Sequence, residues 1–299
     1  MILKHHDSRE KDILVLKELL AYQLSPKQRF LIEREIDAIQ KGERGENDSA
    51  YYINFHFGDS KNWIVIHDLR IELEDRAAQI DHILINRIFD IYVLESKNYK
   101  YGVRITETGE FEAYYNGKYI GIPSPIEQNK RHIDLLSQFI RHYDLLPKRL
   151  AIQVAPKYYN YVLLSPDAII RRPKPDRFDS SSVIKADALF TAIKGEIDQR
   201  SGLNMLSSIT KLSSFSTVEE FARNLVSHHA PIEIDWKRKF GIDETFKRDE
   251  KLERPPKKSK FFCARCRADI SERVARFCWN NKKRFGGRAY CFNCQKHYV

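Results

Sequence analysis

The sequence contains no apolar run that approaches the roughly 18–20 residues of a membrane-spanning helix. It also has no leader in which positive charge is followed by an apolar stretch, the pattern of an export signal. A membrane protein and an exported protein are therefore not expected, and we predict a cytoplasmic protein. The 299 residues, 42% of them hydrophobic, suffice for one large domain with a sizeable core and one small domain.

Cysteine and an excess of positive charge are both absent from the first 246 residues. These contain 35 Lys and Arg against 36 Asp and Glu, a net charge of −1, whereas residues 247–299 contain 16 against 5, a net charge of +11. All five cysteines also lie in this last fifth of the chain. A concentrated basic segment is typical of a site for polyphosphate partners such as nucleic acid. A solvated, disordered tail would explain the charge but not the cysteines.

Two short apolar runs, residues 83–85 and 91–94, have the composition of strands that are buried on both faces. Asp81 precedes the first run, and Glu95 and Lys97 follow the second. Because residues two apart on a strand point to the same face, Glu95 and Lys97 are expected to project together. If the two strands pair, Asp81 lies beside Glu95. Two carboxylates and an amine are the groups needed to hold a divalent metal ion and to activate a water molecule.

Four motifs with apolar flanks follow one another in this part of the chain. They are Gly42-Glu43-Arg44-Gly45-Glu46, Gln79-Ile80-Asp81-His82, Glu95-Ser96-Lys97-Asn98 and Pro125-Ile126-Glu127-Gln128-Asn129. Together they resemble the NERD (nuclease-related domain) family of the PD-(D/E)XK nucleases, over roughly residues 42–145. The resemblance implies an α/β protein with a restriction-endonuclease-like αβα core, to which this chain adds a helical N-terminal extension and a small C-terminal zinc ribbon.

The resemblance also implies a metal-dependent nuclease that hydrolyses phosphodiester bonds of nucleic acid, and we favour DNA as substrate and internal cleavage. Its catalytic residues would be Glu46, Asp81, Glu95, Lys97 and Gln128. Asp81 and Glu95 would bind one or two Mg²⁺ or Mn²⁺ ions, since hard cations prefer oxygen ligands. Lys97 would orient or help to deprotonate the attacking water, Glu46 would complete or support the metal site, and Gln128 would fix the water or a phosphate.

Two of these residues also have an ordinary structural interpretation. Glu46 stands where a helix over residues 46–57 is expected to begin after a break at residues 42–45, and an acid there favours the helix dipole. Gln128 and His132 lie four apart on the amphipathic helix expected over residues 123–143, and could form an exposed polar pair. We do not expect His132 to be catalytic.

The cysteines near the C-terminus form two pairs, Cys263-x2-Cys266 and Cys291-x2-Cys294, with 24 residues between them. In a reducing compartment this pattern predicts a structural zinc site with four thiolate ligands rather than disulfides. Cys278 is expected to be a small core residue, although exchange with a ligand stays open. A piece of about 40 residues buries too little surface to fold alone, so the metal would contribute much of its folding free energy.

A basic and aromatic hairpin is expected between the two cysteine pairs. Its cations are Arg276, Lys282, Lys283, Arg284 and Arg288. Cations interleaved with aromatic rings suit phosphate contacts combined with base stacking, so we predict that this module binds nucleic acid. The alternative is that the aromatic residues form the core of the module and the cations are solvated.

The resulting domain prediction has four parts. They are a helical N-terminal extension (1–41), a nuclease-like domain (42–245), a charged linker (246–260) and a zinc ribbon (261–299).

Two other functions fit the sequence: a DNA-binding module on a catalytically weak nuclease fold that recruits a helicase-type partner, and a phage-defence enzyme that is active only with a partner. A homodimer would make cutting of both strands of a duplex easier.

Overall fold

The computed structural model describes residues 1–99, 101–115, 117–149, 152–199, 212–243, 246 and 261–298. The chain forms two units. One comprises Met1–Leu16 and Leu31–Trp236, and the other comprises Lys17–Phe30 and Lys237–Val299. We call residues 261–298 the C-terminal module and describe it separately. Among the described residues, no helix combines the length and the apolar composition that crossing a lipid bilayer requires.

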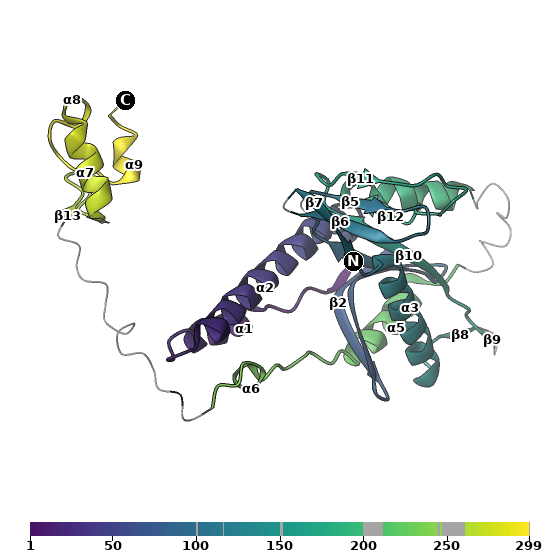
Figure 1. Cartoon of the computed structure of the whole chain (residues 1–299). Helices are drawn as coiled ribbons and strands as arrows, with labels where there is room; N and C mark the ends of the chain where they lie inside the picture. Colours follow the sequence, from purple (N-terminus) through teal and green to yellow (C-terminus); the bar gives the residue numbers. More distant parts are fainter. Residues whose placement is uncertain are drawn as a thin grey trace. The chain divides into compact units, whose positions relative to one another are not determined.

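A six-stranded mixed sheet forms the centre of the first unit (Figure 1), in the order β1-β2-β3-β4-β10-β12. The strands are β1 (Ile2–Lys4), β2 (Trp63–Leu73), β3 (Arg76–Asn86), β4 (Asp90–Lys97), β10 (Lys157–Leu164) and β12 (Val183–Lys185). β2, β3 and β4 form an antiparallel meander, whereas β1 runs parallel to β2, and β10 runs parallel to both β4 and β12. The predicted strands around the two apolar runs are confirmed as β3 and β4.

Helices cover both faces of this sheet. On one face, α3 (Pro125–His142) and α5 (Phe215–Ser227) lie side by side (Figure 1) over a core to which β4 contributes Ile91 and Val93. On the other face, a core that includes Tyr92 and Leu94 packs under the end of α2 (Pro26–Ile53), the π-helical turn η1 (Asn54–Gly58) and a helix over residues 189–199. The short 3₁₀ turn η2 (Ala186–Ala188) precedes that helix. Alternate residues of β4 therefore enter two different cores, which explains its unbroken apolar sequence.

The glycines and aromatic residues between residues 101 and 122 predict hairpins at the edge of the main sheet; the hairpins form, but they belong to a second sheet. This sheet has the order β11-β5-β6-β7. Its strands are β5 (Val103–Ile105), β6 (Phe111–Tyr115), β7 (Lys118–Ile122) and β11 (Ile170–Arg171). Two-residue strands, β8 (Lys148–Arg149) and β9 (Ile152–Gln153), form a separate pair. The sequence of residues 150–155 also predicts a strand, but residues 150 and 151 lie outside the described residues.

The expected helix break at residues 42–45 is wrong. After α1 (Glu10–Leu19), helix α2 runs without interruption from Pro26 to Ile53 and passes through both Gly42 and Gly45. Glu46 therefore lies inside a helix, not at a helix start, and its interpretation as a residue that favours the helix dipole is also wrong. The sequence of residues 182–198 predicts a helix, but its first residues form β12 and the helix begins at residue 189. A further helix is expected over residues 204–215, most of which lie outside the described residues.

Helices lie between the two cysteine pairs of the C-terminal module, so the hairpin expected there is wrong. The elements of the module are β13 (Phe261–Phe262), β14 (Asp269–Ile270), α7 (Glu272–Asn280), α8 (Lys282–Phe285) and α9 (Phe292–Gln295), with β13 and β14 antiparallel. Ser271 starts α7, because its Oγ accepts a hydrogen bond from the backbone N–H of Val274 at 3.4 Å. Ala275 and Cys278 on α7 are buried, so this helix supplies part of the core of the module.

Candidate active site and cysteine cluster

The structure brings all five predicted catalytic residues to one cleft of about 480 Å³ in the first unit. Its lining includes Glu46, Asp81, Glu95, Lys97 and Gln128. Asp81 and Glu95 come from adjacent strands, next to the register pair of His82 with Leu94. The backbone N–H of Ser96 donates a hydrogen bond of 2.7 Å to Oδ2 of Asp81, which ties the acid on β3 to the end of β4.

Glu95 has the most contacts of the five. It is 2% exposed, and its Oε1 accepts hydrogen bonds from Nζ of Lys97 at 2.6 Å and from Nε2 of Gln128 at 2.8 Å. Nδ1 of His132 lies 3.4 Å from its other oxygen, Oε2. Gln128 and His132 are thus half-buried and turned towards Glu95, so the interpretation as an exposed pair is wrong. The contact of His132 was not predicted, although its spacing of four from Gln128 places both on one face of α3.

Helix α3 is fixed to the sheet next to Glu95 by a residue that the sequence analysis missed. Asn129 is fully buried, and its Nδ2 donates to the carbonyl oxygens of Val93 at 2.7 Å and Tyr161 at 3.2 Å, one on β4 and one on β10. The helix begins at Pro125, where Oγ of Ser124 accepts a hydrogen bond from the backbone N–H of Glu127. The first turn of α3 is therefore placed accurately, and with it Gln128.

The pKa values of the two central acids, Asp81 and Glu95, are shifted in opposite directions. Burial raises the pKa of Asp81 well above its ordinary value, and the negative charges of Glu95 and Glu46 raise it further. Burial would also raise the pKa of Glu95, but the contact with His132 and the ammonium of Lys97 outweigh it and lower that pKa. Glu95 in turn outweighs the effect of burial on Lys97 and raises its pKa, so Lys97 carries a positive charge.

Glu46 reaches this cleft because α2 passes unusually close to the end of β4. A β-carbon added to Gly45 would lie 2.8 Å from the β-carbon of Asn98, so only a glycine fits there without displacement. The side chain of Asn98 also donates a hydrogen bond of 3.4 Å to the carbonyl oxygen of Lys41. The glycines of the first motif therefore permit a close helix–strand contact and do not end the helix.

The alternation of side chains is interrupted on both β2 and β3 beside the cleft. Residues three apart, which alternation would place on opposite faces, lie in the same core on each strand: Ile66 with Leu69, and Ile80 with Ile83. Asp68 and Asp81 lie within these interruptions, and Asp68 has a left-handed φ of 54°. Irregularities of this kind re-aim side chains and are frequent next to active sites, and here one turns Asp81 into the cleft.

The donor set of the cleft fits a hard divalent cation. Three carboxylates line it, and Oε2 of Glu95 is buried without a hydrogen-bond partner among the described residues. Burial is the largest cause of the raised pKa of Asp81, and repulsion by Glu95 and Glu46 adds to it, while Lys97 lowers that pKa less. A divalent cation held by Asp81 and Glu95 would remove that repulsion.

His67 and His82 lie on the opposite side of β3 and β4 from Glu95, beside the end of α2. Burial lowers the pKa of His67 to about 3 and lowers that of His82 well below its ordinary value. Nearby histidines lower both further, so the two imidazoles are neutral.

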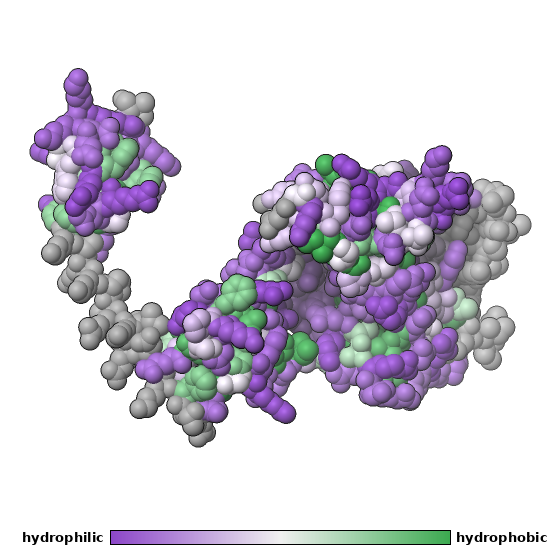
Figure 2. All heavy atoms as spheres, viewed as in Figure 1, coloured by the Kyte–Doolittle hydropathy of each residue, from purple (hydrophilic) through white to green (hydrophobic). Residues whose placement is uncertain are grey.

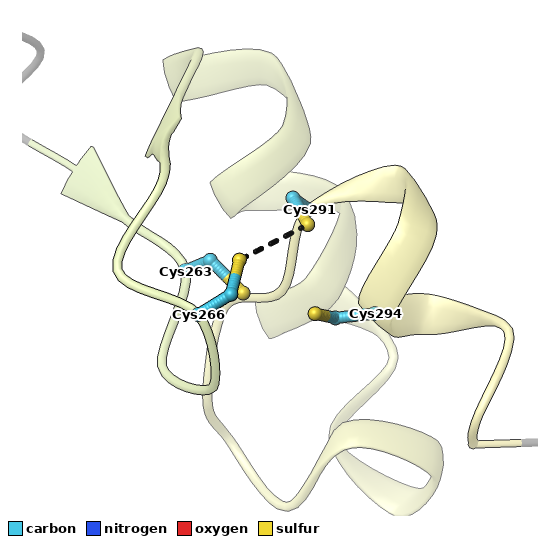
Figure 3. A group of neighbouring side chains, drawn as sticks. All are labelled: Cys263, Cys266, Cys291 and Cys294. Carbon is cyan, nitrogen blue, oxygen red and sulfur yellow. Dashed lines mark hydrogen bonds between the residues drawn. The ribbon is translucent and has the colours of Figure 1, made fainter.

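The four paired cysteines converge in the C-terminal module (Figure 3). The sulfur atoms of Cys263, Cys266, Cys291 and Cys294 all lie within 4.8 Å of one another, and those of Cys266 and Cys291 are 3.6 Å apart. A tetrahedral zinc ion with Zn–S bonds of about 2.3 Å would place its sulfurs about 3.8 Å apart. The arrangement is thus that of a metal-binding cluster. Cys278 is fully buried and lies outside this group, as predicted.

The protonation of these thiols is unequal. Burial would raise the pKa of Cys263, but backbone N–H groups of Cys266, Cys291 and Arg265 outweigh it and lower the pKa to about 6. Burial and the three neighbouring thiols raise the pKa of Cys294 to about 12. One thiolate is therefore available at neutral pH to begin metal binding.

The five predicted nucleic-acid-binding cations are all exposed. Arg276 lies on α7, Lys282, Lys283 and Arg284 lie on α8, and Arg288 follows α8. Arg276 is paired with Glu272 at 2.7 Å, and Arg284 donates to the carbonyl oxygen of Tyr298. Phe277 is 51% exposed and Phe292 is 74% exposed, so these rings are not all used in the core. Hydrophobic patches accordingly lie among hydrophilic residues on the surface of the module (Figure 2).

Comparison with known proteins locates a family in the same part of the chain. Residues 41–165 match the family model of the nuclease-related domain, NERD. This range contains all five predicted catalytic residues, and the resemblance to the nuclease-related domain drawn from the four motifs is confirmed over it. No curated protein and no solved structure matches the chain.

Proposed function

We propose that this chain, which carries a nuclease-related domain over residues 41–165, is a metal-dependent nuclease that hydrolyses phosphodiester bonds within DNA. The observation that carries the proposal is the set of contacts made by Glu95. A carboxylate that is 2% exposed is joined there to Lys97 and Gln128 and lies beside a second acid, Asp81. Burying a charged carboxylate costs free energy unless a partner charge, hydrogen bonds or a metal ion compensates it, so a cluster of this kind indicates a functional site.

Asp81 and Glu95 are the residues that would hold the cation, with Glu46 as a further carboxylate at the same cleft. When bound, Mg²⁺ or Mn²⁺ would polarise a phosphoryl oxygen and lower the pKa of a bound water molecule. Glu95 is oriented for this role by two hydrogen bonds on Oε1, which leave Oε2 available for the cation.

Lys97 would orient the attacking water and offset negative charge as it develops on the phosphoryl group. Its ammonium is held at 2.6 Å from Glu95 and is 26% exposed, so it can reach a substrate at the mouth of the cleft. Gln128 uses its amide nitrogen on Glu95. Its role is therefore to position Glu95, and its amide oxygen is left to accept a hydrogen bond from the water.

The C-terminal module would hold the substrate and perform no chemistry. Its exposed cations can neutralise phosphates, and exposed rings such as Phe277 and Phe292 can stack on bases. A Zn²⁺ ion bound by the four cysteines would be structural, because four thiolates leave no open position for a substrate.

The test is cleavage of closed circular duplex DNA and of circular single-stranded DNA with Mg²⁺ or Mn²⁺. These substrates have no ends, so any product shows internal cutting. The variant Glu95→Gln keeps the size of the side chain and removes its charge. The matched control is Glu127→Gln, since Glu127 is an exposed acid on α3 whose carboxylate pairs with Lys130 at 2.7 Å.

Cutting by the parent chain and by Glu127→Gln, with loss of cutting in Glu95→Gln, would support the proposal. Equal cutting by all three proteins would contradict it. Binding of DNA without cutting by any of them would favour the second candidate, a binding module that acts with a partner.

A further inference from the structure

Three histidines from distant parts of the sequence meet beside the carboxylate cleft. His6 follows β1, His67 lies on β2 and His82 lies on β3. One ring nitrogen of each lies within 4.8 Å of one ring nitrogen of each of the others. The strand β1 creates this cluster, because its parallel pairing with β2 brings the chain to His6 at the level of the other two histidines.

The outer nitrogens of two of the rings are already held. Nε2 of His67 lies 2.9 Å from Oδ1 of Asn54, and Nε2 of His82 lies 2.9 Å from Oγ of Ser96. The Nδ1 atoms of the two rings consequently face each other, at 2.7 Å. Histidines that bind a metal through one nitrogen usually donate the other N–H to an oxygen of the protein, and both rings have such an oxygen.

His6 completes the group on its third side. Its ring stacks on that of His67 with 5.0 Å between centroids, and it meets the edge of His82 at 5.2 Å. Both of its ring nitrogens are buried and have no hydrogen-bond partner among the described residues. Oε2 of Glu46 lies 3.4 Å from Nδ1 of His6, in a contact that does not form a hydrogen bond.

We propose that His6, His67 and His82 form a second metal site, selective for a transition-metal ion such as Zn²⁺. Imidazole nitrogens suit Zn²⁺, whereas Mg²⁺ and Mn²⁺ prefer the oxygen ligands of the carboxylate cleft. Zn–N bonds of about 2.0–2.1 Å in a tetrahedral site place the nitrogens about 3.3 Å apart, so the two Nδ1 atoms, now 2.7 Å apart, would separate by about 0.6 Å.

A hydrogen-bond chain without metal accounts for only part of this arrangement. Ser96 can donate to His82, His82 to His67, and His67 to Asn54, which uses every nitrogen of the two buried rings. The same chain leaves both nitrogens of His6 without a partner, although they are removed from water. A metal ion would bind the nitrogen of His6 that lies within 4.8 Å of a ring nitrogen of each of the other two histidines.

A bound ion would affect the neighbouring carboxylate cleft by fixing the positions of the elements beside it. Glu46 lines the carboxylate cleft and also contacts His6, and His82 is adjacent to Asp81 in the sequence. A bound ion would therefore hold β2, β3 and the segment that follows β1 together, next to the point from which Glu46 enters the cleft. The proposal does not depend on the nuclease activity, because it concerns binding alone.

The test uses the full chain with its cysteines saturated by one equivalent of Zn²⁺ and with Mg²⁺ in excess over the carboxylate cleft. Further Zn²⁺ is added and its binding is measured by calorimetry. The variant is His6→Gln, and the matched control is His5→Gln, the adjacent histidine that lies outside the cluster. The parent and His5→Gln should bind one additional equivalent, and His6→Gln should bind it at least tenfold more weakly.

A second readout needs no variant. In the chain labelled with ¹⁵N-histidine, added Zn²⁺ should shift the ring nitrogen signals of His6, His67 and His82 and leave those of the half-buried His228 unchanged. Absence of an additional equivalent, equal affinity of His6→Gln and His5→Gln, or a shift of His132 in place of the three would each overturn the proposal.

Discussion

Gly45 on α2 and Asn98 at the end of β4 lie so close that a β-carbon on the glycine would come within 2.8 Å of the β-carbon of the asparagine. The helix backbone therefore packs directly against the strand that carries Glu95 and Lys97. Since Glu46 is the next residue on the helix, this contact sets the distance between Glu46 and the other acids.

The first prediction concerns the two glycines of α2. Gly45→Ala should push α2 away from β4 and lower the rate of cleavage at least about tenfold, since small displacements of catalytic groups are costly. Gly42→Ala is the matched control, because its added β-carbon would meet no atom within 4 Å. It should raise the free energy of unfolding by about 1 kcal/mol through helix propensity alone. Thermal melting and cleavage rates check both, and equal rates would show that the close contact does not matter.

The second prediction concerns Lys97. Lys97→Ala should lower kcat by about 100-fold or more while the affinity for DNA changes little, because its charge is used on the reacting phosphate. Lys130→Ala removes an exposed lysine that pairs with Glu127 and should leave both quantities unchanged. Single-turnover rates and DNA-binding curves separate the two effects. A Lys97→Ala protein that cuts as fast as its parent would exclude this role.

The third prediction concerns the raised pKa of Asp81. Because its pKa in the folded chain lies above the ordinary 3.8, the free energy of unfolding is largest when Asp81 is protonated and decreases as the pH rises through that pKa. Asp81→Asn removes this loss, so without metal it should melt at a higher temperature than the parent at neutral pH. The difference should vanish near and below the ordinary pKa.

Adding a divalent metal ion should reverse the order of the melting temperatures of the parent and Asp81→Asn. Mg²⁺ should raise the melting temperature of the parent, since a ligand that binds only the folded chain stabilises it. It should not raise that of Asp81→Asn, which lacks a carboxylate ligand. Melting curves with and without Mg²⁺ measure this, and an equal rise in both proteins would remove Asp81 from the metal site.

The fourth prediction concerns the cysteine cluster. The chain reconstituted with Co²⁺ should show thiolate-to-cobalt charge-transfer absorption, and Cys266→Ser should lose most of it along with the fold of the module. Cys278→Ala should keep it, because Cys278 is buried outside the cluster, at a cost of about 1 kcal/mol for the small cavity. Persistence of the absorption in Cys266→Ser, or its loss in Cys278→Ala, would assign the ligands differently.

The strands that carry the acids were predictable because burial on both faces leaves a distinctive apolar run, as at Ile83 to Ile85 and Ile91 to Leu94. The proximity of Asp81 to Glu95 followed from the pairing of those strands. By contrast, a glycine in the sequence is compatible both with the end of a helix and with a close contact between a helix and a strand. Only the contact with Asn98 shows that Gly45 serves the second purpose.

Other features depend on contacts between distant parts of the sequence. The strand β1 has three residues and owes its existence to pairing with β2, some 60 positions later, so neither it nor the position of His6 could be inferred. The aromatic residues of the C-terminal module suggested strands. Its Ser271 cap and the buried face that includes Ala275 and Cys278 favoured a helix instead.

The most direct test of the central claim is the position of a divalent ion in crystals of the full chain grown with Mn²⁺, located by its anomalous scattering. We predict a Mn²⁺ ion bound between the carboxylates of Asp81 and Glu95, lost in Glu95→Gln. A protein that cuts circular DNA in solution with Mn²⁺ but shows no ion between these two carboxylates would contradict the account.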